Sequence, residues 1–262
     1  MILYVIGTGP GDISYMSQRA IEVIEKVDCV AGYTTYIDLI ADLVKDKEII
    51  STGMMKEVER VEKAIEQALS GKSCALVSGG DPGIYAMAGL VFEICQQRDI
   101  KLIRTRGKIK PSDRDTGLPL EIIPGIPALA AGAALAGAPL THDFAAISLS
   151  DLLTPWGKIE KRLTYAAMAD FVIVLYNPKS KKRDWQLKRA RDLILEQRDG
   201  ATPVGIVTGA MRENQSISFT TLDQMDTARV GMQTVIFIGS TASIRYLDFL
   251  FTPRGYSKKY DI

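Results

Sequence analysis

The stretch Gly79-Gly80-Asp81-Pro82-Gly83-Ile84-Tyr85 decides the fold class of this chain. It follows an apolar run at residues 75–78, typical of a buried strand, and precedes apolar residues 86–92, which read as a helix. A glycine-rich turn between a strand and a helix lies at the carboxyl edge of an open α/β sheet, where such folds bind ligands. The turn is neither a Rossmann G-x-G-x-x-G nor a P-loop, because no Gly-Lys-Ser/Thr follows. We therefore expect a ligand site of another kind here.

Two further turns have the same placement. Gly7-Thr8-Gly9-Pro10-Gly11-Asp12 follows the apolar run 3–6, and Pro124-Gly125 follows the strand-like residues 120–123. Each turn alone could be a simple tight connection between a strand and a helix. Their joint occurrence after three strands favours a shared ligand site.

Strands and helices alternate along the whole chain, which predicts mostly parallel sheets with helices on both faces. In the helix predicted at 57–69, Val58, Val61, Ile65 and Leu69 are expected to face the core, with charged residues including Arg60 on the opposite side. The rhythm restarts after residue 140, with strands expected near 145–149, 171–175, 204–207 and 234–238. We therefore expect two α/β domains, 1–140 and 141–262, with a cofactor cleft between them.

A basic segment at residues 101–119 interrupts this rhythm. Arginines and lysines alternate there with Gly and Pro, and no periodicity survives. The segment is either a solvated connection or a basic flap over an anionic ligand.

Composition excludes several classes of function. The 262 residues carry a formal net charge of +1, which argues against a large nucleic-acid interface. No apolar run is long enough to cross a bilayer, and the N-terminus lacks the basic region of a signal peptide. His142 is the sole histidine, and Cys29, Cys74 and Cys95 lack metal-ligand spacing, so we expect no metal site and reduced thiols. We therefore expect a cytoplasmic protein.

The three glycine-rich turns, in this order, resemble those of the tetrapyrrole (class III) methyltransferases, which use S-adenosyl-L-methionine. The second half is similar to the C17-methyltransferase branch of cobalamin biosynthesis at residues 142–144, 147–156, 175–178 and 180–183. This resemblance implies a homodimer that methylates C17 of precorrin-3B, or of its cobalt-bearing counterpart, and contracts the macrocycle. The chain departs from the family at residues 101–119, a longer connection than usual. It also has Ile126-Pro127-Ala128 where many relatives place a hydroxyl residue, which puts one cofactor contact in doubt.

The resemblance and the positions of the turns together suggest the site residues. Asp81 is expected near the amino-acid end of the cofactor, because its carboxylate suits a cationic or hydroxyl-bearing group. The other expected cofactor contacts are Pro10, Gly79, Gly80, Ile84, Tyr85, Pro127, Ala128, Leu152, Tyr176, Asn177, Ala210 and Thr234.

Substrate and catalytic residues are expected mainly in the second half. A tetrapyrrole bears many carboxylates, and a near-neutral protein must pair them locally with cations, for which the candidates are Lys181, Lys182, Arg183 and Arg212. His142 and Asp143 are the candidate acid/base groups for ring contraction, since imidazole can exchange protons near neutral pH. A structural role for His142 remains open.

Two alternatives stay open on the sequence. One is methylation of another precorrin position, or of a different substrate, by the same fold. The other is a protein that binds adenosylmethionine or a tetrapyrrole without catalysis. Production of S-adenosylhomocysteine in the presence of a tetrapyrrole distinguishes the enzyme from the binding protein.

Overall fold

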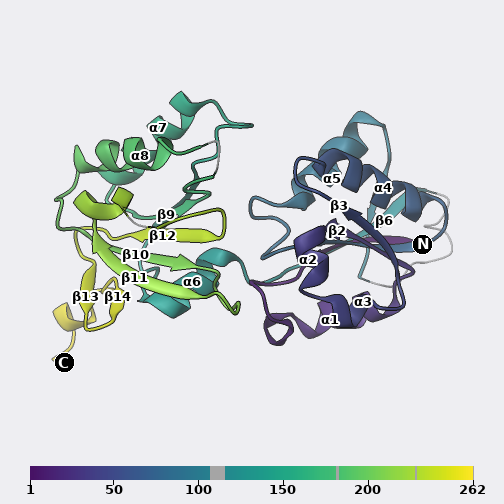
Figure 1. Cartoon of the computed structure of the whole chain (residues 1–262), viewed down its shortest axis with the longest axis horizontal. Helices are drawn as coiled ribbons and strands as arrows, with labels where there is room; N and C mark the ends of the chain where they lie inside the picture. The colour runs from purple at the N-terminus through teal and green to yellow at the C-terminus, as the bar shows by residue number, and fades with distance from the viewer. Residues whose placement is uncertain (107–115, 181–182, 228, 262) are drawn as a thin grey trace. The chain divides into compact units, whose positions relative to one another are not determined.

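A computed structural model describes residues 1–106, 116–180, 183–227 and 229–261. Its chain divides into two compact units, Met1–Pro127 and Ala128–Ile262 (Figure 1). This division places the helix after Pro127 in the second unit, whereas a boundary near residue 140 would place it in the first. The two α/β domains expected from the sequence are confirmed.

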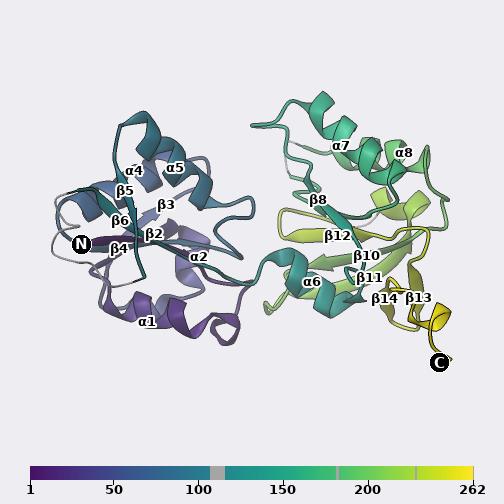
Figure 2. The ribbon, with the colours of Figure 1, turned by 180° about the vertical axis from the view of Figure 1, so that it is seen from behind.

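The first unit is a six-stranded parallel sheet in the order β3-β2-β4-β1-β6-β5. Helices α4 and α5 cover one face, and α1 with its neighbours covers the other (Figures 1 and 2). Along β1, Leu3 and Val5 belong to the hydrophobic core under α4 and α5, while Tyr4 and Ile6 belong to the core under α1. Burial on both faces explains why the sequence of β1 is continuously apolar. The elements are β1 (Ile2–Gly7), α1 (Gln18–Lys26), β2 (Cys29–Tyr33), α2 (Thr34–Asp38), α3 (Ala41–Val44), β3 (Glu48–Thr52), α4 (Glu57–Leu69), β4 (Ser73–Ser78), α5 (Met87–Gln97), β5 (Leu102–Arg104) and β6 (Leu118–Ile123), with a 3-10 turn at Ile13–Tyr15.

The second unit holds a five-stranded mixed sheet in the order β11-β10-β12-β9-β8. Helices α7 and α8 pack on one face and α6 on the other (Figure 2). A three-stranded sheet, β13-β14-β7, lies beside them. The elements are α6 (Ala128–Ala136), β7 (Gly137–Ala138), β8 (Phe144–Ser148), α7 (Trp156–Met168), β9 (Val172–Tyr176), α8 (Gln186–Leu195), β10 (Pro203–Thr208), β11 (Ser216–Thr221), β12 (Thr234–Ile238), β13 (Ile244–Tyr246) and β14 (Phe249–Phe251), with 3-10 turns at Leu222–Thr227 and Tyr256–Lys258.

This second sheet is less parallel than the sequence suggested. Its β8–β9 pair is parallel, but the pairs joining β9, β12, β10 and β11 are antiparallel. A parallel pair needs a crossover of about a dozen residues or more, and the connection 209–215 between β10 and β11 is too short to supply one. The chain therefore turns back on itself at this point.

The expected orientation of α4 was also wrong in part. Val58 and Leu69 are exposed, whereas Arg60 is only 3% exposed and shares the buried face with Val61 and Ile65. The apolar positions alone suggested a stripe that included Val58, but the helix is rotated so that a charged side chain enters the interior. Its polar contacts are described below.

The remaining expectations concern the cysteines, a metal site, membrane-spanning segments and the basic segment. The three cysteines are buried and unpaired. In the described parts of the chain, no cluster of histidine, cysteine and acidic side chains is arranged to hold a metal, and no helix is long and apolar enough to span a bilayer. The core of the basic segment, residues 107–115, lies outside the described residues.

Candidate functional site

The three glycine-rich turns of the first unit meet at the carboxyl edge of its sheet. The Thr8 backbone N–H donates to the Ser78 carbonyl oxygen at 2.9 Å, which extends the β1–β4 pairing beyond both strands. Gly9 and Gly80 then exchange two backbone hydrogen bonds, at 3.2 and 2.7 Å. The first two turns thus form one continuous backbone surface.

Glycine is required here because the backbones approach too closely for side chains. A Cβ on Gly7 would lie 2.5 Å from the Gly80 carbonyl oxygen and 2.6 Å from the Gly125 nitrogen. A Cβ on Gly125 would in turn collide with the Gly80 oxygen and lie 2.8 Å from the Gly7 carbonyl group. Gly9 and Gly80 also have positive φ angles, of 72° and 70°. The edge therefore presents bare backbone, as a closely held ligand requires.

Asp81 ties the second turn to the third. Its Oδ1 accepts from the Gly83 backbone N–H at 2.8 Å, and its Oδ2 accepts from the Gly125 N–H at 3.2 Å. A carboxylate has about four acceptor positions, and these two hydrogen bonds use two of them. Asp81 therefore has a structural contact that the sequence did not suggest, in addition to the predicted ligand contact.

The remaining predicted contacts of the first unit surround these turns. Pro10 is buried, Ile84 is half-buried, and Tyr85 is 55% exposed with a positive φ of 52°. A positive φ is costly for a bulky aromatic residue, and such strain is concentrated at functional sites. Pro127 ends this unit and is half-buried.

The predicted contacts of the second unit also gather at one sheet edge. Strands β8, β9 and β10 all end there, and β12 begins there. Asn177 follows β9 with a positive φ of 52°, and its Nδ2 donates to Ser148 Oγ, at the end of β8, at 3.0 Å. Thr234 Oγ1 lies 2.8 Å from Thr208 Oγ1 across the β12–β10 pair.

Tyr176 links this edge to helix α6. The backbone N–H of Leu129 donates to Tyr176 Oη at 2.8 Å, in the first turn of α6, directly after Ala128. Helix N-termini leave backbone N–H groups without intrahelical partners, and the phenol oxygen satisfies one of them. Ala210 is buried nearby in the same core, and Leu152 is 73% exposed.

The predicted cations have different surroundings. Arg183 NH2 donates to the Asn177 carbonyl oxygen at 3.1 Å, and its NH1 lies 3.4 Å from Ser150 Oγ. Arg183 thus supports the turn after β9. Arg212 is half-buried, and its backbone N–H donates to the Gly209 carbonyl oxygen at 2.9 Å. Lys181 and Lys182 lie outside the described residues.

The structure separates the two acid/base candidates from the other predicted residues of their unit. His142 and Asp143 precede β8, so they lie at the amino end of that strand, while Ser148 ends it at the opposite edge. The His142 and Asp143 side chains are 55% and 80% exposed. The Asp143 backbone N–H donates to His142 Nδ1 at 2.9 Å, and Asp143 Oδ2 lies 3.7 Å from the same nitrogen.

Sequence reasoning missed several residues at these edges. Tyr36 packs its ring against Gly79, where a Cβ would lie 2.6 Å from the ring. Ser148 and Thr208 hold neighbouring turns, as described above. The available signal was their position at or just after a strand end, since parallel strands bring their carboxyl ends together.

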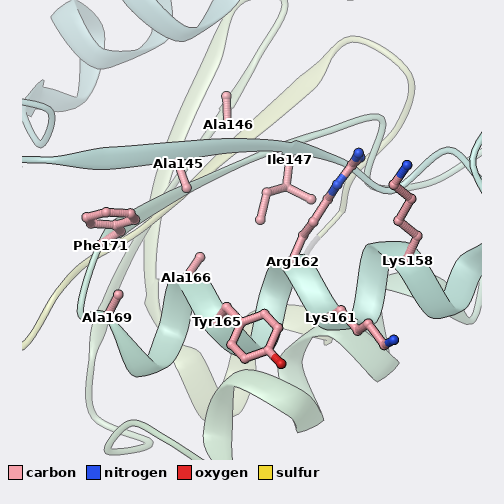
Figure 3. A pocket seen from close by; sticks show the side chains of 10 residues that line it. All are labelled: Ala145, Ala146, Ile147, Lys158, Lys161, Arg162, Tyr165, Ala166, Ala169 and Phe171. Carbon is pink, nitrogen blue, oxygen red and sulfur yellow. The ribbon is translucent and has the colours of Figure 1, made fainter.

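A hollow of about 600 Å³ lies elsewhere on the second unit, between the edge strand β8 and helix α7 (Figure 3). Apolar side chains and three cations line it, including Ile147, Lys158, Arg162, Tyr165 and Phe171. None of the predicted site residues is among its lining residues. This hollow is therefore separate from the glycine-rich edges, which remain the candidate site.

Comparison with known proteins identifies the family of this chain. The family model of the tetrapyrrole (corrin/porphyrin) methylases matches residues 2–106 and 107–226. A cobalt-factor III methyltransferase of Priestia megaterium is 44% identical over 99% of this chain, which spans 46% of that protein's length. A precorrin-3B C(17)-methyltransferase of Sinorhizobium sp is 38% identical over 97% of each chain. The crystal structure of the methyltransferase CobJ has a TM-score of 0.84 and 32% identity, covering 96% of this chain and 99% of that one. This chain therefore belongs to the tetrapyrrole (corrin/porphyrin) methylase family, in the group of cobalt-factor III and precorrin-3B C17-methyltransferases.

Proposed function

We propose that this protein transfers the methyl group of S-adenosyl-L-methionine to C17 of a precorrin-3-level tetrapyrrole, with contraction of the ring, in cobalamin biosynthesis. The observation that carries the proposal is the 38% identity to a precorrin-3B C(17)-methyltransferase over 97% of both chains. A homodimer in the cytoplasm is part of the proposal. The substrate is either metal-free or cobalt-bearing.

The residues at the edge of the first unit fit such a cofactor. A Cβ on Gly7 or Gly125 would fill the surface of bare backbone at this edge, and Gly80 has a positive φ of 70°. Asp81 retains acceptor capacity toward an ammonium or ribose hydroxyl. When bound, the sulfonium supplies an electrophilic methyl group. The protein's part is to hold the acceptor carbon in line with it, and alignment of this kind is worth roughly 7–11 kcal/mol.

Residues of the second unit are also proposed to contact the cofactor or the substrate. Tyr176, Asn177, Ala210 and Thr234 form a fixed edge against which a cofactor or substrate would be placed. The cluster Lys181-Lys182-Arg183 follows this edge in sequence and is proposed to pair with substrate carboxylates. Because the described Arg183 contacts hold the Asn177 turn, its proposed role combines support of the turn with a positive charge.

Ring contraction requires proton movement in addition to methyl transfer. His142 and Asp143 remain the proposed acid/base pair, and their exposed side chains are open to a partner. They lie at the amino end of β8, so the His142→Ala variant tests their role separately from cofactor binding.

One assay tests the proposal. Purified protein would be incubated with S-adenosylmethionine and either a metal-free or a cobalt-bearing trimethylated tetrapyrrole, and the products analysed by mass spectrometry. We expect one added methyl group, stoichiometric S-adenosylhomocysteine and a contracted ring. Binding of S-adenosylmethionine without any product from either substrate would refute the enzymatic function.

A substitution at Gly80 tests whether the turn at residues 79–85 binds the cofactor. Gly80 has a φ of 70°, which a β-branched residue adopts at high cost, so Gly80→Val should abolish adenosylmethionine binding while the protein stays folded. Unchanged affinity by calorimetry would remove the Gly-rich turn from the proposed site.

A further inference from the structure

Arg60 is a charged side chain in an unusual position. It lies on α4 and is 3% exposed. Within the described residues its hydrogen-bond acceptors are all uncharged, and the ion pairs found there do not include it. Burial lowers the pKa of the Arg60 guanidinium, an effect that the charge of Glu57 opposes. A charge in the interior without an ionic partner is energetically unfavourable, so the position of Arg60 calls for an explanation.

The contacts of Arg60 converge on the carboxyl edge of the first sheet. Its Nε donates to Thr52 Oγ1, at the end of β3, at 2.7 Å, and its NH2 donates to the Gly53 carbonyl oxygen at 3.0 Å. Its guanidinium also lies over the ring of Tyr33, at the end of β2, with the Cζ atom 5.8 Å from the ring centre. The charge is thus fixed from two strand ends.

Two sets of side-chain contacts connect Arg60 to the two ends of the Gly79–Ala86 turn. On one side, the ring of Tyr33 meets that of Tyr36 edge-on at 5.5 Å, and Tyr36 packs directly on Gly79. On the other side, Arg60 NH1 lies 3.7 Å from the sulfur of Met87, the first residue of α5. The segment between these two ends contains Gly80 and Tyr85, both with positive φ.

We propose that Arg60 is a positioning residue, which holds both ends of the Gly79–Ala86 turn through the Tyr33–Tyr36 pair and Met87 and so maintains the conformation that binds the cofactor. The inference rests on the proposed function, because it assumes that this turn binds S-adenosylmethionine. The cation over the Tyr33 ring and the edge-to-face Tyr33–Tyr36 pair are both attractive contacts, and together they resist relaxation of a strained turn.

A second buried arginine provides a matched control. Arg198, in the second unit, is 6% exposed and donates to the carbonyl oxygens of Ala166, Phe171 and Gly239. Burial lowers its pKa also, and its Nε lies 3.9 Å from Asp170 Oδ1. Its contacts join the end of α7 to β12 and include none of the proposed cofactor residues. If removal of any buried charge weakened cofactor binding, replacement of either arginine should do so. If positioning of the turn is what matters, only replacement of Arg60 should weaken binding.

The experiment compares Arg60→Met, Arg60→Lys and Arg198→Met with the wild type. The dissociation constant of S-adenosylhomocysteine would be measured by calorimetry, below the melting temperature of every variant. Loss of a residue that supports a binding group commonly weakens binding by about 10–100-fold, as for the residues behind metal ligands. We expect at least a tenfold weaker affinity for Arg60→Met, an intermediate value for Arg60→Lys, and a change of less than about twofold for Arg198→Met.

The outcomes separate the inference from the function on which it rests. Wild-type affinity in Arg60→Met, with a loss of melting temperature like that of Arg198→Met, would overturn the positioning role. Failure of the wild-type protein itself to bind S-adenosylhomocysteine would overturn the proposed cofactor site and the inference with it. If Arg60→Met does not fold, the same binding measurement is made on Tyr33→Leu and Tyr33→Phe. The proposal expects weak binding in the first and near-normal binding in the second, because only phenylalanine keeps the ring; equal affinities would overturn it.

Discussion

Replacement of Gly125 by alanine should loosen the junction of the three turns. The added methyl carbon would collide with the Gly80 carbonyl oxygen and lie 2.8 Å from the Gly7 carbonyl carbon and oxygen. All of these are backbone atoms of the other two turns, so no side-chain rotation relieves the clash. Overpacking of this kind costs about 1–3 kcal/mol. At about 2–4 °C per kcal/mol for a chain of this size, we expect the melting temperature to fall by roughly 2–12 °C.

The same substitution should weaken cofactor binding. Separation of the turns would lengthen the hydrogen bond from the Gly125 N–H to Asp81 Oδ2, now 3.2 Å, and would release the Asp81 carboxylate from its present position. We expect the affinity for S-adenosylhomocysteine, measured by calorimetry, to fall at least tenfold, which corresponds to about 1.4 kcal/mol.

Gly89→Ala is the matched control. Gly89 lies on α5, and a Cβ there would meet nothing within 4 Å. Alanine is favoured over glycine inside a helix by about 0.5–1 kcal/mol, so this variant should be slightly stabilised and bind normally. A Gly125→Ala protein that matched the wild type in both melting temperature and affinity would refute the close-approach reasoning.

Three further predictions concern other parts of the molecule. If His142 acts in ring contraction, His142→Ala should still consume S-adenosylmethionine but accumulate a methylated, uncontracted product, with the second step slowed by about 10²–10⁴-fold; normal product with a lower melting temperature would make it structural. If the charge of Arg183 serves substrate carboxylates, Arg183→Gln should raise the substrate KM and flatten its dependence on salt, and an identical salt series for both proteins would leave it only a support for the turn after β9. A hydrogen bond to Cys29, together with burial, raises the pKa of the Cys74 thiol, and burial raises the pKa of the Cys95 thiol. Their contribution to stability is therefore complete below the unfolded-state value of about 8.5 and declines as the pH rises above it. The melting temperature should fall across that range, and Ellman's reagent should react with these thiols only after unfolding; rapid reaction in the native state would contradict their burial.

Sequence alone determined the fold class and the family. Residues 3–6 and 75–77 are apolar, which is typical of strands covered on both faces, and a glycine-rich turn follows each strand. Parallel strands place such turns at the same edge of a sheet, so the sequence alone predicts that these turns share one edge. These features are local in the chain, and a local pattern is readable in one sequence.

Tertiary structure decided what depends on partners distant in sequence. Asp81 could be predicted as a site residue, but not as the bridge to Gly125, because the bridge requires knowing which turns approach each other. Arg60 looked like a solvent-facing residue, since its charge opposes burial unless acceptors from other segments are already in place, and Thr52 and Gly53 supply them only in the folded protein. His142 could be expected near the other site residues from sequence order, yet the direction of β8 carries it to the opposite edge from Ser148. Strand direction and buried polar contacts are properties of the assembled sheet, and for this reason no single segment of the sequence contains them.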